Sequence, residues 1–91
     1  MWTNRQHDMP PTLEVITILA DVLNLGKRRD LLHAGSPLLG SIPELDSMAV
    51  INVLTALEEH FGISIDDDDI SAATFSTVAT LAVYVDRKRN A

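Results

Sequence analysis

Leu45-Asp46-Ser47-Met48, with the apolar pattern that follows it, decides the fold of this chain of 91 residues. The Asp46 carboxylate is suited to accept hydrogen bonds from the free N–H groups of a first helical turn. We therefore expect a helix from Ser47 to about Phe61, with Gly62 as the residue after its end. Its apolar residues recur at the i, i+3, i+4, i+7 spacing of a buried helical face: Val50, Ile51, Val53, Leu54, Leu57 and Phe61.

Ser47 stands at the start of this expected helix, where its hydroxyl would face solvent. The free N–H groups and the dipole of a helix favour negative charge at this end, so the position suits a serine that carries a phosphodiester-linked group. The stripe opposite the apolar face contains Met48, Asn52, Thr55 and Glu59. Met48 is interpreted either as a flexible contact for several partners or as a gap-filler at the rim of the core.

An earlier helix is expected from residue 11 or 12 to residue 25. Pro11 suits the first helical position, and Gly26 suits the residue after the end. The basic residues 27–29 follow and suit the negative end of a helix. The expected core stripe of this helix consists of Leu13, Val15, Ile16, Ile18, Leu19, Val22 and Leu23.

Two more helices are expected after residue 65. The aspartates 66–69 would cap a short third helix near Ile70 to Ala73, and Ser76 or Thr77 would cap a fourth helix that reaches about residue 87. The inward residues of that last helix are Val78, Leu81, Ala82 and Val85.

The connection between residues 26 and 46 is long for a loop in a small domain. We expect a short turn of helix at residues 30–33, and we expect apolar residues to pin the loop across the bundle: Leu31, Leu32, Leu38, Leu39, Ile42 and Leu45. The fold prediction is thus an all-α, small four-helix bundle with a long first loop and a short third helix. The expected divisions are a flexible N-terminal segment (1–10), the folded domain (11–87) and a C-terminal tail (88–91).

Composition narrows the function classes. The chain has no cysteine, which excludes disulfides, thiolate metal sites and a thiol nucleophile. No apolar run approaches the ~18 residues of a membrane span. Only 4% of the residues are aromatic, so the core must be mostly aliphatic.

The net charge of −6 is unevenly distributed along the sequence. Residues 44–69 hold eight acids and no Lys or Arg, whereas basic residues cluster at 27–29 and 87–89. This arrangement favours basic protein partners over nucleic acid, although an acidic surface also serves solubility alone.

The sequence gives little support for a catalytic site or a metal site. The consecutive aspartates 66–69 lack the spacing and glycine of a calcium-binding EF-hand loop, and His7, His33 and His60 share no helical face. A triad of Ser47, His60 and an aspartate fails because about 20 Å of helix separates the serine from the histidine. We therefore expect neither a metal site nor enzymatic activity.

Two segments resemble the acyl and peptidyl carrier protein family, whose pattern is Asp-Ser-Leu before an apolar helix that ends in acids and an aromatic. Here Asp46-Ser47-Met48 precedes Leu57-Glu58-Glu59-His60-Phe61-Gly62-Ile63. Ile70-Ser71-Ala72-Ala73-Thr74-Phe75-Ser76-Thr77-Val78 resembles the family's junction between its third and fourth helices. The resemblance extends over residues 12–86.

The resemblance implies that a phosphopantetheinyl transferase attaches 4′-phosphopantetheine to Ser47, next to Asp46. The thiol of that arm would carry acyl groups as thioesters. Acyl-loading ligases or synthases would supply the catalysis, and they would dock at Glu44, Met48, Glu58 and Glu59. Aliphatic side chains would shelter the acyl chain between the helices: Ile51, Leu54, Leu57, Val78 and Leu81.

Some positions depart from the family pattern. Met48 replaces the usual leucine, and Ala49 and Asn52 stand where fatty-acid carriers usually have acids. We expect a free-standing, monomeric, cytoplasmic acyl carrier for lipid (including fatty acid), secondary-metabolite or exopolysaccharide-linked synthesis. The alternatives are an aminoacyl or peptidyl carrier, and an unmodified helical interaction module.

Overall fold

The structure is a computed structural model that describes residues 11–38, 40–66 and 70–90. The regular secondary structure in these ranges consists of helices. They are α2 (Thr12–Val22), the 3-10 helix η2 (Gly26–Leu31), α3 (Ser47–Phe61) and α4 (Val78–Asn90). Within the described ranges there is no strand, and an isolated β-bridge joins Pro37 to Thr77. The predicted all-α fold class is confirmed.

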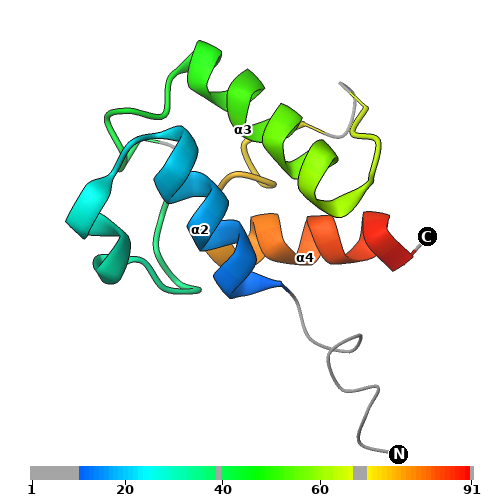
Figure 1. Cartoon of the computed structure of the whole chain (residues 1–91), viewed down its shortest axis with the longest axis horizontal. Coiled ribbons are helices and arrows are strands. Elements are labelled where there is room, and N and C mark those ends of the chain that lie inside the picture. Colours follow the sequence, from blue (N-terminus) through cyan, green and yellow to red (C-terminus); the bar gives the residue numbers. More distant parts are fainter. Residues whose placement is uncertain (1–10, 39, 67–69, 91) are drawn as a thin grey trace, which may run out of the picture.

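Helix α2 lies at the centre of the packing. It contacts both α3 and α4 more extensively than those two helices contact each other, and Figure 1 shows the three helices grouped closely. The core is aliphatic except for Phe75, the single fully buried aromatic side chain among the described residues. The largest side chains that are almost completely buried are Phe75, Leu19, Leu38, Leu57, Leu81, Val15, Val53, Val78 and Val85.

Both ends of α3 agree with the prediction. The Ala49 N–H donates to Asp46 Oδ1 at 2.8 Å, and Asp46 has extended backbone angles, as an N-cap residue should. Gly62 follows the helix in the left-handed region with φ 64°, and the Ile63 N–H donates to the Glu58 carbonyl at 3.2 Å. These bonds satisfy groups that a helix end otherwise leaves without partners.

Helix α2 ends earlier than residue 25, where the prediction placed its end. Asn24 adopts φ 58°, and the Leu25 N–H donates to the Ala20 carbonyl at 3.0 Å. This left-handed C-terminal turn stops the helix at Val22, so Gly26, with φ 60°, begins η2 instead of terminating α2. The prediction that Leu13 belongs to the core is also wrong, because this side chain is 75% exposed.

The long connection is held in place by its own bonds to α4. The Leu38 N–H donates to the Ser76 carbonyl, and the Val78 and Ala79 N–H groups donate to the Ser36 and Ala34 carbonyls. Of the six apolar residues expected to pin it, Leu38 and Leu45 are buried, Leu32 and Ile42 are half-buried, Leu31 is exposed, and Leu39 lies outside the described residues. The helical turn expected at 30–33 is replaced by η2, which begins earlier.

The segment before α4 differs from the expected short third helix. Residues 72–75 form a turn, in which the Phe75 N–H donates to the Ser71 carbonyl and the Ser76 N–H to the Ala73 carbonyl, both at 3.3 Å. The turn inserts Phe75 into the core. Of the expected cap of aspartates, residues 67–69 lie outside the described ranges.

Helix α4 begins with a reciprocal cap. The Thr80 N–H donates to the Thr77 hydroxyl at 3.1 Å, and the Thr77 N–H donates to the Thr80 hydroxyl at 3.0 Å. Thr77, one of the two expected cap residues, is therefore the one that caps α4. The helix continues to Asn90, so residues 88–90 belong to it and not to the tail expected from residue 88; residue 91 and the expected flexible segment 1–10 lie outside the described ranges.

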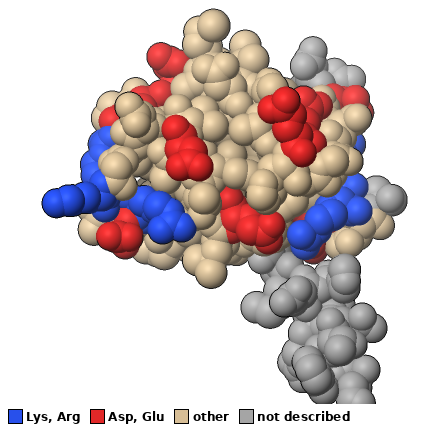
Figure 2. Space-filling view, in the orientation of Figure 1, with Lys and Arg blue, Asp and Glu red and all other residues tan. Residues whose placement is uncertain are grey.

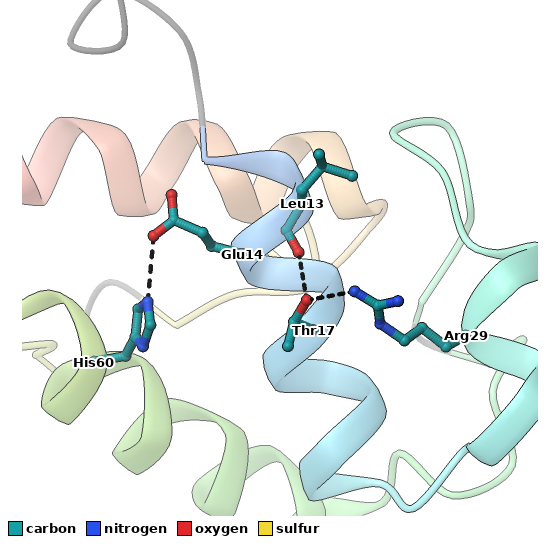
Figure 3. A network of polar contacts seen from close by, with 5 residues as sticks. All are labelled: Leu13, Glu14, Thr17, Arg29 and His60. Carbon is teal, nitrogen blue, oxygen red and sulfur yellow. Dashed lines mark hydrogen bonds and ion pairs between the residues drawn. The ribbon is translucent and has the colours of Figure 1, made fainter.

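Polar contacts join α2 to its neighbours on the outer side of the bundle (Figure 3). His60 Nε2 lies 3.2 Å from Glu14 Oε2, and Arg29 donates to the Thr17 hydroxyl at 2.8 Å. These groups are exposed, so each contact contributes at most about 1 kcal/mol, and aliphatic burial dominates the stability.

Ile51 corrects the predicted inward face of α3. It is 56% exposed, whereas Leu57 on the same helix is completely buried. We expect Leu57→Ala to lower the free energy of unfolding by about 2–5 kcal/mol, because it leaves a cavity in the core. Ile51→Ala, the matched control, should change it by less than about 0.5 kcal/mol. Urea unfolding followed by circular dichroism measures both, and equal losses would contradict this burial pattern.

Candidate functional site

Ser47 is an exposed residue at the first position of α3. Asp46 caps the helix through Ala49, and the Val50 N–H donates to the Asp46 carbonyl at 2.9 Å, so the local backbone is fixed on both sides of the serine. A negatively charged substituent on the Ser47 hydroxyl would lie at the positive end of α3. The geometry thus confirms that Ser47 occupies the helix start that the sequence predicted.

A shallow groove of about 340 Å³ adjoins Ser47. It lies between the first turns of α3 and the turn that precedes α4. Its lining residues are uncharged and mostly apolar: Ser47, Val50, Ile70, Ser71, Ala72 and Phe75. A slender chain attached to the serine hydroxyl can lie along this groove without burying a charged side chain of the protein.

The groove does not contain the residues that were predicted to surround an acyl chain. Leu57, Val78 and Leu81 are completely buried core residues, and Leu54 is 8% exposed. Ile51 faces solvent, so its predicted inward position is wrong.

Sequence analysis missed Ile70 and Phe75 as groove residues, although both belong to the quoted junction segment, and it assigned Val50 to the core stripe. The pattern could not identify them, because Ile70 and Phe75 lie outside the helices, so no helical period predicts which way their side chains face.

The four residues predicted to contact partners differ in their surroundings. Met48 is 68% exposed, and Glu59 is exposed as well. Glu44 is paired with Arg28, and Glu58 Oε2 accepts a hydrogen bond from the Ile65 N–H at 2.8 Å. Two of the three candidate acids therefore have bonds within the protein, while Met48 and Glu59 are exposed to solvent.

The charge distribution is visible in Figure 2. Lys and Arg side chains appear at two sides of the molecule, near η2 and near the end of α4, whereas the surface over the first turns of α3 is mostly uncharged. The residues that line the groove beside Ser47 are uncharged as well. Asp46, which is exposed and directly precedes Ser47, is the acid nearest to the serine in the sequence.

The Arg28–Glu44 pair gives a testable pH dependence. The hydrogen bond from Arg28 holds the pKa of Glu44 below its ordinary value of 4.5. A lowered folded-state pKa stabilises the fold above the unfolded pKa, and this contribution is lost as the pH falls through the folded value. Melting curves of Arg28→Gln should therefore lie below those of the parent at neutral pH, and the difference should shrink as the pH falls below 4.5.

Lys27→Gln is the matched control, because it removes the same charge from the neighbouring residue without removing the bond to Glu44. The melting temperature of this variant should follow that of the parent across the same pH range. A difference between parent and Arg28→Gln that stays constant to low pH would contradict the assigned role of Glu44.

No helix among the described residues is both long and apolar enough to cross a membrane. Within the same ranges, no three His, Cys, Asp or Glu side chains gather closely enough to hold a metal ion. The site therefore consists of an exposed serine, a helix N-terminus and an uncharged groove.

Comparisons with known proteins show which family the chain resembles. Residues 14–85 match the family model for a phosphopantetheine attachment site. The chain is also similar to a holo acyl carrier protein from Nitrosomonas europaea whose structure was determined by solution NMR. The two are 58% identical with a TM-score of 0.84, over 91% of this chain and 100% of that one. A comparison with curated proteins gives no match.

Proposed function

The chain belongs to the acyl carrier protein family, and we propose that it carries acyl groups as thioesters on an arm attached to Ser47. The family membership makes it a carrier of covalent 4′-phosphopantetheine and not a catalyst. The observation that supports Ser47 as the attachment point is its exposed position at the capped start of α3, beside an uncharged groove.

The residues around Ser47 fit such an arm. Its phosphodiester would carry negative charge at the N-terminus of α3, where the helix dipole and free N–H groups are favourable. The groove of Val50, Ile70 and Phe75 has room for the slender part of the arm. When bound, the arm supplies the terminal thiol that a chain without cysteine lacks.

The role of the protein in attachment is to present a hydroxyl. The Ser47 oxygen would form a bond to the phosphorus of coenzyme A that carries the pantetheine. The bond from that phosphorus to the oxygen of adenosine 3′,5′-bisphosphate would break, and the serine proton would pass to a base of the transferase. Asp46 keeps its capping bond to Ala49 and thereby holds Ser47 at the start of the helix. Preorganisation of this kind lowers the cost of positioning the reacting oxygen.

Ser47→Ala tests the attachment point. We expect the variant to keep a native circular dichroism spectrum, because Asp46 still caps α3. Incubation with coenzyme A and a broad-specificity phosphopantetheinyl transferase should add the phosphopantetheine mass to the parent but not to this variant. Ser71→Ala is the control, since Ser71 is a second exposed serine of the same groove. A mass increment that persists in Ser47→Ala would show that another residue carries the arm, and a parent without any increment would favour an unmodified interaction module.

The chemical identity of the cargo is a more specific part of this proposal. We assign acyl groups, handled by an acyl-loading ligase or synthase in lipid, secondary-metabolite or exopolysaccharide-linked synthesis, in a cytoplasmic monomer. An aminoacyl or peptidyl carrier would have the same attachment chemistry. A loading assay on the holo protein distinguishes the two, because fatty acyl ligases would load the first kind of carrier and amino-acid-adenylating enzymes the second.

Shelter of the acyl chain is a further part of the proposal. The groove beside Ser47 is the entrance that the fold offers, and Leu54 lies one turn beyond Val50 on the same helix. The buried aliphatic side chains of Leu57, Val78 and Leu81 would have to separate to admit a chain beneath the groove. An aliphatic core adapts to such a change at a smaller cost than a core of rigid aromatic rings.

Acyl chains of increasing length on Ser47 test this shelter. The melting temperature should rise with chain length and then level off, because each buried methylene contributes up to about 0.8 kcal/mol. Leu54→Trp should flatten the rise, since the larger ring fills space that the chain needs. Comparison of chain lengths within the variant removes any general loss of stability. A melting temperature independent of length in the parent would mean that the cargo stays in solvent.

A further inference from the structure

The chain reaches Ser47 through residues 40–46, which form turns and irregular backbone. At the end of this segment the Asp46 N–H donates to the Glu44 carbonyl at 3.1 Å. Asp46 then caps α3, since its carboxylate accepts the Ala49 N–H at 2.8 Å. The place of Ser47 at the start of α3 is therefore linked, through Asp46, to the place of the turn at Glu44.

Arg28 connects this turn to a second element of the fold. Its guanidinium, which belongs to η2, donates to Glu44 Oε2 across a separation of 16 residues. This hydrogen bond is the main cause of the lowered pKa of Glu44, so the contact favours the charged carboxylate. The neighbouring Leu45 is buried in the core. The same turn is thus held from inside by Leu45 and from outside by the ion pair.

The surroundings of the Glu44 carboxylate show why the ion pair matters for the backbone. Oxygen Oε1 of Glu44 is shielded from solvent and has no hydrogen-bond partner among the described residues. A carboxylate that loses water needs an opposite charge or a donor in compensation, and Arg28 supplies both. Without Arg28 the carboxylate would regain water by an outward movement of Glu44. The Glu44 carbonyl, which accepts the Asp46 N–H, would move with it.

We propose that Arg28 is a positioning residue for the modification of Ser47, which acts through Glu44 by holding the 40–46 segment in the arrangement that lets Asp46 cap α3. The inference rests on the proposed attachment at Ser47. Arg28 does not contact the reacting atoms in this role. A misplacement of about 1 Å is costly for a reacting oxygen. A looser segment therefore lowers the fraction of carriers that meet the transferase with the hydroxyl in place.

Neutral variants of the two partners distinguish positioning from attraction of a charged enzyme. Arg28→Gln makes the carrier more negative, and Glu44→Gln makes it less negative. Electrostatic steering would therefore raise the modification rate in one variant and lower it in the other. Both changes break the same ion pair, so loss of positioning lowers the rate in both.

The test measures kcat/KM of a phosphopantetheinyl transferase with coenzyme A and each carrier, at a temperature where melting curves show every variant to be folded. We expect Arg28→Gln and Glu44→Gln each to lower kcat/KM about threefold, which is the size of effect that a partly exposed ion pair allows. The double variant should also lose about threefold, because both changes remove one shared contact. Lys27→Gln, the matched control, removes the same charge as Arg28→Gln and should leave kcat/KM unchanged.

Amide hydrogen exchange of the unmodified protein gives a second readout that needs no enzyme. Exchange of the Ala49 N–H should be about threefold faster in Arg28→Gln, because its bond to Asp46 opens more often. The Ile63 N–H, which donates to the Glu58 carbonyl at the other end of α3, is the internal reference and should exchange as in the parent. Faster exchange at both amides would indicate a general loss of stability and would overturn the inference.

The reversed pair, Arg28→Glu with Glu44→Arg, should restore both kcat/KM and the exchange rate of Ala49. Recovery of the exchange rate alone would show that the enzyme contacts one of the two side chains directly, and would overturn the inference. Losses that multiply in the double glutamine variant, or rate changes of opposite sign in the two single variants, would do the same. A parent that gains no phosphopantetheine refutes the attachment at Ser47, whereas a fully modified parent with rates equal to those of the variants refutes the positioning role alone.

Discussion

The hydrogen bond from the Ala49 N–H to Asp46 fixes where α3 begins, and it thereby places Ser47 at the exposed first position of that helix. A helix advances by about 100° per residue, so the apolar stripe of α3 sets which side faces the core and the cap sets where the helix begins. With Asp46 as the cap, Val53 and Leu57 point into the bundle while Ser47 and Ile51 remain outside.

The opposite wall of the site depends on the long connection and not on a helix. Backbone bonds from residues 34–38 to the start of α4 hold that helix beside the connection, and the turn before α4 inserts Phe75 into the aliphatic core. Phe75 thereby contributes to the core and to the groove beside Ser47. The groove consequently has one rigid side on α3 and one side made from a single hydrogen-bonded turn, which explains how a small domain presents a hollow without a large cavity.

The parts of this structure that were predictable from sequence are those set by short-range interactions. Asp46 and Gly62 define α3 because a carboxylate cap and a left-handed glycine act within one turn of helix. The end of α2 was missed because two nearby residues, Asn24 and Gly26, both adopt positive φ, and the sequence pattern favoured the glycine. The turn in place of a third helix likewise reflects packing of Phe75, which no local pattern reports.

The same distinction between short-range interactions and packing separates the candidate site residues that were predicted correctly from those that were not. Ser47 was predictable because its position follows from the cap beside it. Ile51 was misplaced because an apolar period identifies a stripe but not its edge, which depends on how far α2 and α4 extend over α3. Identification of the groove residues Ile70 and Phe75 likewise required the three-dimensional structure, because they are distant from Ser47 in the sequence and lie beside it only in the folded protein.

The acids show why the number of acidic residues in the sequence overstates the number of carboxylates that are available to bind a partner. Glu44 and Glu58 contribute to the net charge of −6, yet each is bonded within the protein, to Arg28 and to the Ile65 N–H. Their carboxylates still contribute to the long-range field, which affects the rate of encounter with a charged partner. Close contact depends instead on groups that are free to form new bonds or to lose water.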